Sequence, residues 1–227
     1  MQQSIALNIA KVRERIRNAE EIYQRKPNAV TLMAVSKTRS ANEIRQAIAA
    51  GATDIGENYL QEALDKQQHL ADINVCWHFI GPIQSNKTRA IAEHFDWVHS
   101  VDRLKIAQRL SNQRPSDMPS LNVCLQVNTS GEASKAGVSL NELSSLAAEV
   151  DILPRIRLRG LMSIPEASQH IDEQKAAFAV LQQAFINLQK TCRNLDTLSM
   201  GMSADMEAAI AEGSTMVRIG TDLFGPR

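Results

Sequence analysis

The sequence has few cysteines, and their placement argues against two kinds of site. Cys76, Cys124 and Cys192 are the only three in 227 residues, and they are widely spaced and odd in number. They form no C-x-x-C pair, so the spacing predicts neither a zinc site nor a disulfide framework. Cys76 and Cys124 lie in apolar runs that suit small core residues, and reduced thiols are typical of cytoplasmic proteins. We therefore expect no metal and a cytoplasmic location.

Long apolar segments and an excess of one charge are also missing. No run approaches the roughly 20 apolar residues that span a bilayer, and the N-terminus lacks the features of a secretory signal. The 25 Lys and Arg residues balance 25 Asp and Glu residues, which gives a formal net charge of zero. No overall charge then attracts nucleic acid or anionic lipid. We expect neither a nucleic-acid partner nor a membrane partner.

Hydrophobic periodicity indicates one helix followed by alternating strands and helices. Ile5, Ile9, Val12 and Ile16 belong to a stripe that recurs at helical spacing and predicts an N-terminal helix. Capping-box patterns at 40–43 and 139–142 predict two further helix starts, and residues 168–192 form the longest helical segment. Between the helical segments lie eight short β-branched or apolar runs, at residues 31–36, 54–56, 76–80, 97–101, 122–128, 158–162, 197–200 and 216–219.

Strict alternation of strands and helices implies parallel pairing, because each crossover must return to the same end of the sheet. Eight such units predict a closed (β/α)8 TIM-type barrel preceded by the N-terminal helix. An open doubly wound sheet is the alternative, and a length near the typical 250 or so residues favours the barrel. No linker divides the chain, so residues 1–227 are expected to form a single domain.

Lys37 stands where the first apolar run gives way to a polar stretch. A lysine at the end of a strand can be partly desolvated by its neighbours, which lowers the pKa of its ammonium group. The neutral amine can then form a Schiff base with a carbonyl compound. A solvated lysine that merely ends a strand is the commoner case, so the other strand ends must decide between these alternatives.

The predicted seventh and eighth strands end in sequences that suit a phosphate. The loops after these two strands often bind phosphate in parallel barrels. Gly201 lets the backbone approach an anion, and Ser203 is predicted to cap a helix whose amides face the same point. Simple turn glycines and an ordinary helix cap are the alternative for either loop alone, but both loops together favour phosphate. The predicted phosphate site lies in residues 199–206, with a second pair of amides and a hydroxyl from Gly220 and Thr221.

Arg218 interrupts an apolar run. By strand alternation it points away from the side taken by Val217 and Ile219. A buried guanidinium requires a partner, which is either a carboxylate, such as Glu57 or Asp205, or a ligand acceptor. Sites for pyridoxal phosphate can place an arginine against the pyridine nitrogen. A strand-end amine, a phosphate site and this arginine together predict an aldehyde cofactor with a phosphate and a ring nitrogen.

At these motifs the sequence resembles the pyridoxal phosphate homeostasis protein family, whose members look like the barrel domain of alanine racemase standing alone. The resemblance covers nearly the whole chain and is carried by residues 34–38, 56–59, 77–81, 84–87, 199–206 and 217–221. It implies a cytoplasmic barrel with pyridoxal 5'-phosphate bound to Lys37 as an internal aldimine. It also implies that Arg218 faces the ring nitrogen, that Asn58 and His78 line the cofactor cavity, and that the phosphate is held by Ser199, Gly201, Ser203, Gly220 and Thr221.

The resemblance implies a role in vitamin B6 and amino-acid homeostasis without catalytic turnover, so no catalytic residue is assigned. An amino-acid racemase is the alternative, but the racemase family's second base is a tyrosine from an additional domain that this chain is expected to lack. Its tyrosines are Tyr23 and Tyr59. A barrel whose Schiff-base lysine acts on a phosphorylated sugar is a third possibility. Apo-enzymes that receive the cofactor are the expected partners, Lys135 is a candidate transient acceptor, and a monomer is expected.

Overall fold

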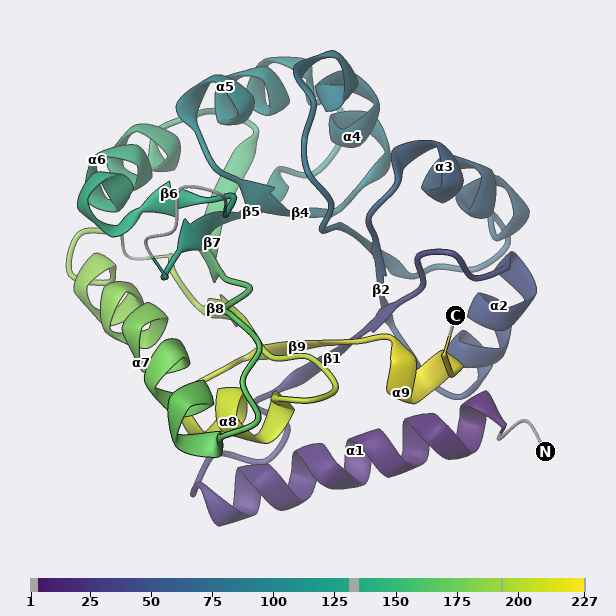
Figure 1. Ribbon diagram of the computed structural model, residues 1–227. Coiled ribbons are helices and arrows are strands. Elements are labelled where there is room, and N and C mark those ends of the chain that lie inside the picture. The colour runs from purple at the N-terminus through teal and green to yellow at the C-terminus, as the bar shows by residue number, and fades with distance from the viewer. Residues whose placement is uncertain (1–3, 131–134, 193, 227) are drawn as a thin grey trace.

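Eight parallel strands close into a barrel in the computed structural model, which describes residues 4–130, 135–192 and 194–226 (Figure 1). β9 pairs with β1, and β4 pairs with β5, so the sheet has no open edge. This closure confirms the predicted (β/α)8 barrel and rules out an open doubly wound sheet. Each predicted run overlaps one of the barrel strands, which are β1 Thr31–Val35, β2 Asp54–Glu57, β3 Cys76–Phe79, β4 Trp97–Val101, β5 Leu121–Asn128, β7 Ile156–Met162, β8 Thr197–Ser199 and β9 Met216–Ile219.

One further short strand was not predicted. β6 covers only Val138–Ser139 and pairs in parallel with Val127 and Asn128 at the end of β5. It lies outside the closed ring, and a two-residue element is too short to produce a recognisable period. Ser139 also precedes the next helix, where its hydroxyl oxygen accepts a hydrogen bond from the Glu142 amide at 3.3 Å.

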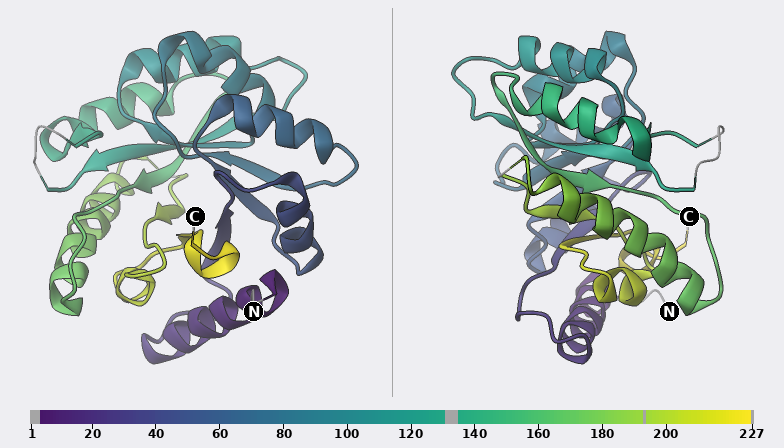
Figure 2. Two further views of the ribbon diagram at one scale, coloured as in Figure 1. Left: turned by 45° about the vertical axis from the view of Figure 1, so that its right-hand side comes forward. Right: turned by 90° about the vertical axis from the view of Figure 1, so that its left-hand side faces the viewer.

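Helices surround the barrel (Figures 1 and 2). The predicted capping box between Ser40 and Glu43 is present at the start of α2, with both reciprocal hydrogen bonds formed. The longest predicted helical segment contains α7, whose Phe178 is fully buried, whereas Ile171 at its first turn is half exposed. The helices are α1 Ile5–Ile22, α2 Ala41–Ala49, α3 Leu60–His69, α4 Thr88–His94, α5 Leu104–Gln113, α6 Leu140–Asp151, α7 Ile171–Leu188, α8 Met206–Ala211 and α9 Thr221–Phe224, with a 3-10 turn η1 at Ser85–Lys87.

The N-terminal helix covers the outside of the barrel where the last strand meets the first. α1 lies beside α8 and α9 (Figure 1), and its buried stripe of Ile9, Val12 and Ile16 packs in one cluster with Val217 and Ile219 of β9. Because these two β9 residues face α1, the alternating side chain of Arg218 must point into the barrel. Among the described helices, none is long and apolar enough to cross a membrane.

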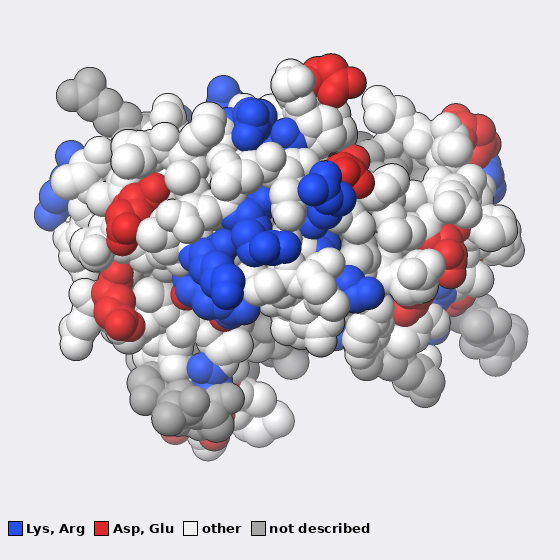
Figure 3. All heavy atoms as spheres, turned by 90° about the horizontal axis from the view of Figure 1, so that it is seen from above, with Lys and Arg blue, Asp and Glu red and all other residues white. Residues whose placement is uncertain are grey.

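The zero net charge conceals a basic face. Figure 3 shows Lys and Arg side chains gathered on the side of the molecule formed by α4 and α5. These helices and η1 carry the exposed side chains of Lys87, Arg89, Arg103 and Lys105. Arg109 of α5 donates to the Ser85 carbonyl at 2.9 Å, which ties η1 to this face. The sequence motif at 84–87 therefore lies on the basic face.

Candidate functional site

A cavity of about 280 Å³ opens at the C-terminal ends of the barrel strands. Parallel barrels place their chemistry at this end, because the loops that follow the strands converge there. Six of the residues predicted from sequence to form the site line the cavity: Lys37, Asn58, Ser203, Arg218, Gly220 and Thr221. The other seven lining residues are Val35, Arg39, Ile80, Met162, Ile164, Met202 and Ala204.

Lys37 reaches the cavity through the alternation of β1. Val35 points into the barrel, Ser36 points out toward α3, and Lys37 points in again, where it is half-buried. The chain then turns sharply at Thr38, whose φ of 65° is unusual for a β-branched residue. The Thr38 amide donates to Glu62 Oε1 of α3 at 2.5 Å, which holds this turn in place. The backbone on both sides of Lys37 is thus held by contacts on the outer side of the sheet.

The outer contacts centre on Lys66 of α3, and we name Ser36, Glu57, Glu62 and Lys66 the Lys66 cluster. Lys66 Nζ donates to the Ser36 carbonyl at 2.8 Å, to Glu57 Oε1 at 2.7 Å and to Glu62 Oε1 at 2.6 Å. The Ser36 hydroxyl also donates to Glu57. The side chains of Lys66 and Glu57 are 7% and 0% exposed, so this ion pair is buried between the strands and α3. Burial raises the pKa of Glu57, and the hydrogen bonds from Lys66 and Ser36 oppose that rise.

The Lys66 cluster corrects one prediction. Glu57 was a candidate partner for Arg218, but it follows Gly56 on β2 and therefore faces α3 on the outer side of the sheet, whereas Arg218 lies inside the barrel. Sequence reasoning also missed Lys66 itself. A lysine in the middle of a polar helix is normally solvated, and only the packing of α3 against β1 and β2 brings it to the peptide that precedes Lys37.

Arg218 is held by backbone and hydroxyl oxygens. Its Nη1 donates to the Ser199 carbonyl at 2.5 Å and to the Ser199 hydroxyl at 2.9 Å, and its Nη2 donates to the Ser163 carbonyl at 2.9 Å. Burial lowers the pKa of Arg218 to about 10, against the attraction of Asp205, so the side chain stays protonated at neutral pH. The nearby Ser163 hydroxyl is buried without a hydrogen-bond partner among the described atoms. Arg218 therefore brings a positive charge to the cavity wall, and Ser163 lies behind it, outside the lining.

Some of the other residues predicted to bind the anion line the cavity, and others lie behind its wall. Gly220 approaches β1 closely, since a Cβ there would lie 3.3 Å from the Val35 carbonyl oxygen. Ser199 and Gly201 do not line the cavity as described: the Ser199 hydroxyl is occupied by Arg218, and the Gly201 carbonyl accepts from the Arg218 amide at 2.9 Å. Gly201 has a φ of 97°, and a Cβ would lie 2.6 Å from that of Ala209, so glycine is required for packing against α8.

Ser203 does not cap α8, contrary to the prediction. α8 begins at Met206, and the residue before it is Asp205. Asp205 Oδ1 accepts from the Met202 amide at 2.6 Å, while the Asp205 amide donates to the Met202 carbonyl at 3.2 Å. These two bonds close a turn that delays the helix and leaves Ser203 and Ala204 at the cavity wall.

His78 lies deeper in the barrel than predicted. Its side chain is fully buried, its Nε2 hydrogen-bonds Asp54 Oδ1 at 3.0 Å, and its Nδ1 hydrogen-bonds His99 Nε2 at 2.9 Å. Ile80, two residues further along the same face of the chain, takes the place at the cavity wall. His78 therefore does not line the cavity, because it lies one layer of side chains below the strand ends.

Arg39 is a lining residue that the sequence reasoning missed. Its Nη2 donates to the Pro226 carbonyl at 3.1 Å and to the Gly225 carbonyl, and its guanidinium lies 5.9 Å from the centre of the Phe224 ring. It thereby ties the segment after α9 to the loop after β1. Its position gave no usable signal, because the left-handed turn at Thr38 interrupts the strand alternation between Lys37 and Arg39.

The strained turn at Thr38 gives a first testable prediction. A left-handed conformation costs a non-glycine residue about 1–2 kcal/mol, and glycine avoids this cost while keeping the amide that donates to Glu62. The greater chain entropy of unfolded glycine offsets about 0.4–1 kcal/mol of the gain. We expect Thr38→Gly to raise the free energy of unfolding by up to about 1 kcal/mol in urea titrations. Thr53→Gly, at an exposed threonine without a positive φ, should lower it instead.

The side chains at the cavity suit a small anion that carries a carbonyl group. Lys37 supplies an amine, Arg218 supplies a buried positive charge, and Gly220 brings backbone close to the site. Asn58 Oδ1 is buried at the cavity without a hydrogen-bond partner among the described atoms, so it has an unused polar group for a ligand. A phosphorylated aldehyde with hydrogen-bonding ring substituents fits these donors and acceptors.

Comparison with known proteins assigns the class of this barrel. The family model described as alanine racemase, N-terminal domain, matches residues 7–227, and the chain is therefore a barrel of the alanine racemase N-terminal type.

Comparison with individual relatives identifies the family within this class of barrels. The chain is 63% identical over 224 residues to the pyridoxal phosphate homeostasis protein of Pseudomonas aeruginosa, an alignment that covers 99% of this chain and 96% of the relative. It is 53% identical to the protein of the same name from Escherichia coli K12, with 98% and 97% covered. The chain belongs to the pyridoxal phosphate homeostasis protein family. PipY of Synechococcus elongatus PCC7942, solved with PLP bound, is 38% identical and superposes with a TM-score of 0.85 over 97% of this chain and 100% of PipY.

Proposed function

We propose that this protein binds pyridoxal 5'-phosphate and holds it on Lys37, and that it acts in vitamin B6 and amino-acid homeostasis inside the cell. The observation that carries the proposal is the single cavity shared by Lys37, Arg218 and the loops after β8 and β9. Lys37 would hold the cofactor through its amine, which is the group at this cavity that can react with an aldehyde. The relative PipY, which has been solved with PLP bound, supports this assignment.

The residues around the cavity take distinct roles in this proposal. Ser203, Gly220 and Thr221 bind the phosphate directly, while Ser199 and Gly201 support Arg218 from behind. Arg218 would serve the pyridine nitrogen as a donor, and Asn58 would serve the ring substituents. When bound, the cofactor supplies an electron-withdrawing ring beside the substrate carbon. A protonated arginine at the ring nitrogen discourages ring protonation and so weakens that withdrawal.

The composition of the cavity wall favours binding and release over racemisation. A racemase needs acid or base groups on both faces of the substrate carbon. Among the described lining residues the ionisable side chains are Lys37, Arg39 and Arg218, and arginines do not act as bases near neutral pH. Tyr59 is 54% exposed and does not line the cavity. Tyr23 lies outside the barrel, where the centre of its ring is 4.9 Å from Lys175 Nζ. Among the described lining residues, none besides Lys37 can serve as a base.

The exposed apolar edge of the cavity supports release of the cofactor to other proteins. Ile164 and Met202 line the cavity and are 48% and 37% exposed, so part of its edge is apolar and open to water. Such an edge suits a protein from which cytoplasmic apo-enzymes receive the cofactor, and we expect the protein to do this as a monomer. Transfer would require an incoming amine to replace Lys37 at the aldehyde carbon.

The proposal is tested by incubating the purified protein with pyridoxal phosphate, recording the absorption spectrum, and reducing with borohydride before peptide mapping. The expected result is a yellow protein and a reduced adduct on Lys37. A protein that stays colourless and takes up no cofactor would refute the proposal and leave a phosphorylated sugar as the ligand to test. Chiral analysis of alanine and serine then separates the two cofactor-based functions, since racemisation at about 1 per second or faster would identify an enzyme.

A further inference from the structure

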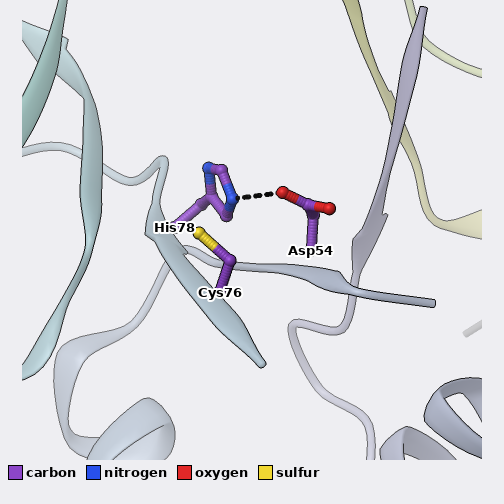
Figure 4. Close-up of side chains that lie close together, drawn as sticks. All are labelled: Asp54, Cys76 and His78. Carbon is purple, nitrogen blue, oxygen red and sulfur yellow. Dashed lines mark hydrogen bonds and ion pairs between the residues drawn. The ribbon is translucent and has the colours of Figure 1, made fainter. Parts of the chain in front are cut away.

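A second cluster of chemically active side chains lies at the opposite, N-terminal end of the barrel. Asp54 begins β2, Cys76 begins β3, and His78 follows two residues later on the same face of β3. Asp54 pairs in register with Cys76, and Gly56 pairs with His78, so the three side chains project into the barrel from neighbouring strands. Figure 4 shows the sulfur, the imidazole and the carboxylate facing one another. We call these three residues the Asp-Cys-His cluster.

The separations within the Asp-Cys-His cluster suit a small divalent cation. One ligand atom from each side chain lies within 4.8 Å of the other two, and His78 Nε2 is 3.0 Å from Asp54 Oδ1. Tetrahedral zinc, with bonds of about 2.0–2.3 Å, places its ligand atoms about 3.3–3.7 Å apart. Side-chain shifts of about 1 Å therefore suffice to bring all three atoms to bonding distance.

Neighbouring residues fix the orientation of the ligands. His78 Nδ1 hydrogen-bonds His99 Nε2 at 2.9 Å, and Trp97 stacks against both imidazole rings with centroids 5.6 Å away. A hydrogen bond to the second ring nitrogen is the usual way in which proteins orient a metal-binding histidine. The Thr53 hydroxyl donates to the other Asp54 oxygen at 2.6 Å. The side chains of His78 and Asp54 are thus already oriented in the metal-free protein.

The Asp-Cys-His cluster is also reachable from solvent. The Asp54 side chain is 16% exposed and Cys76 is partly exposed, whereas His78 is fully buried. The opening lies at the starts of the strands, whereas the Lys37 cavity lies at their ends. A cation can therefore enter without passing through the proposed cofactor site.

We propose that Asp54, Cys76 and His78 form a binding site for zinc or a chemically similar divalent cation. The thiolate and imidazole select zinc-like ions over magnesium and calcium, which prefer oxygen ligands. On binding, the Cys76 thiol gives its proton to solvent, and His78 binds the metal through Nε2 as the neutral imidazole whose single ring proton is on Nδ1 and is donated to His99 Nε2. Three protein ligands leave a fourth position for water on the open side. This site is independent of the proposed cofactor function.

The test is equilibrium dialysis of the full-length protein against zinc, followed by metal analysis, for the wild type, Cys76→Ser, Asp54→Asn and Cys192→Ser. Cys192 is a buried thiol that follows α7 and is not a member of the cluster, so it serves as the matched control. We expect one zinc per wild-type chain and per Cys192→Ser chain. Losing one ligand should weaken zinc binding at least about tenfold in Cys76→Ser and in Asp54→Asn, in line with the effect of perturbing a metal site.

Cobalt substitution at saturating cobalt gives a second readout, which reports the thiolate ligand itself. A thiolate-to-cobalt charge-transfer band is expected in wild type and Cys192→Ser, measured as a difference spectrum, and it should be absent from Cys76→Ser. Three outcomes would overturn the proposal: no zinc bound at micromolar concentrations, zinc binding unchanged in both cluster variants, or a thiolate band that persists in Cys76→Ser. The second outcome would assign the binding to other histidines such as His69, His94 or His170.

Discussion

Replacing Lys37 with alanine is expected to abolish the yellow absorption and the borohydride-fixed adduct while leaving the barrel folded. No other lysine lines the described cavity, so no amine remains in place to form the Schiff base. Ligand binding to the native state stabilises a protein by about 2.7 kcal/mol at a concentration 100 times Kd. Added pyridoxal phosphate should therefore raise the melting temperature of the wild type and raise that of Lys37→Ala much less.

Two companion variants define what the Lys37 result means. Lys37→Arg keeps the positive charge but cannot form a Schiff base, so it should be as colourless as the alanine variant. Lys87→Ala removes an exposed lysine on the basic face and should behave as wild type. If Lys37→Ala still gave a full reduced adduct on another lysine, such as Lys135, the assignment of Lys37 as the anchor would be wrong.

Replacing Lys66 with methionine is expected to destabilise the protein by about 3–5 kcal/mol, the usual cost of removing one member of a buried ion pair. The variant leaves Glu57, whose side chain is 0% exposed, without its cation and leaves the Ser36 carbonyl without its donor. Denaturant unfolding monitored by circular dichroism measures the loss. The effect should extend to the site, because the Ser36 carbonyl belongs to the peptide that leads into Lys37, and adduct formation on Lys37 should become slower.

The pH dependence of the Lys66→Met variant gives a specific signature. The folded-state pKa of Glu57 lies above its ordinary value of 4.5, so the folded protein binds more protons than the unfolded chain above that pH. The contribution of this carboxyl to stability is therefore most favourable at low pH and is lost as the pH rises through the folded pKa. Without Lys66 that pKa rises further, so the destabilisation should be smallest at acidic pH and grow as the pH rises through the range in which Glu57 ionises in the folded variant.

A double variant separates the missing charge from a general packing defect. Lys66→Met combined with Glu57→Gln removes both charges, and it should recover part of the stability and lose the added pH dependence. If the single variant were as stable as wild type, or if its deficit did not change with pH, the Lys66 cluster would not be the support for the Lys37 turn that its contacts indicate.

The site was predictable in part, for reasons that individual residues make clear. Lys37 and Arg218 both line the cavity, and strand alternation, a local property that sets each side chain opposite its two neighbours in sequence, accounts for their direction. Ser203 was misassigned as a helix cap because the turn closed by Asp205 looks like a helix start from sequence. His78 was expected in the cavity because sequence shows that a residue faces the barrel interior but not at which layer it lies.

The sequence by itself determined the barrel, since eight short runs separated by helical segments allow few arrangements of parallel strands, and periodicity is written along the chain. It also determined that Lys37 follows the first strand and that Arg218 lies in the last. Closure of the barrel makes these two strands neighbours. Only the tertiary structure decided that Lys66 supports Lys37 from behind the sheet and that Asp54, Cys76 and His78 meet at the other end. Those contacts depend on the register between strands and on the packing of helices against them, and both are set by the whole folded core.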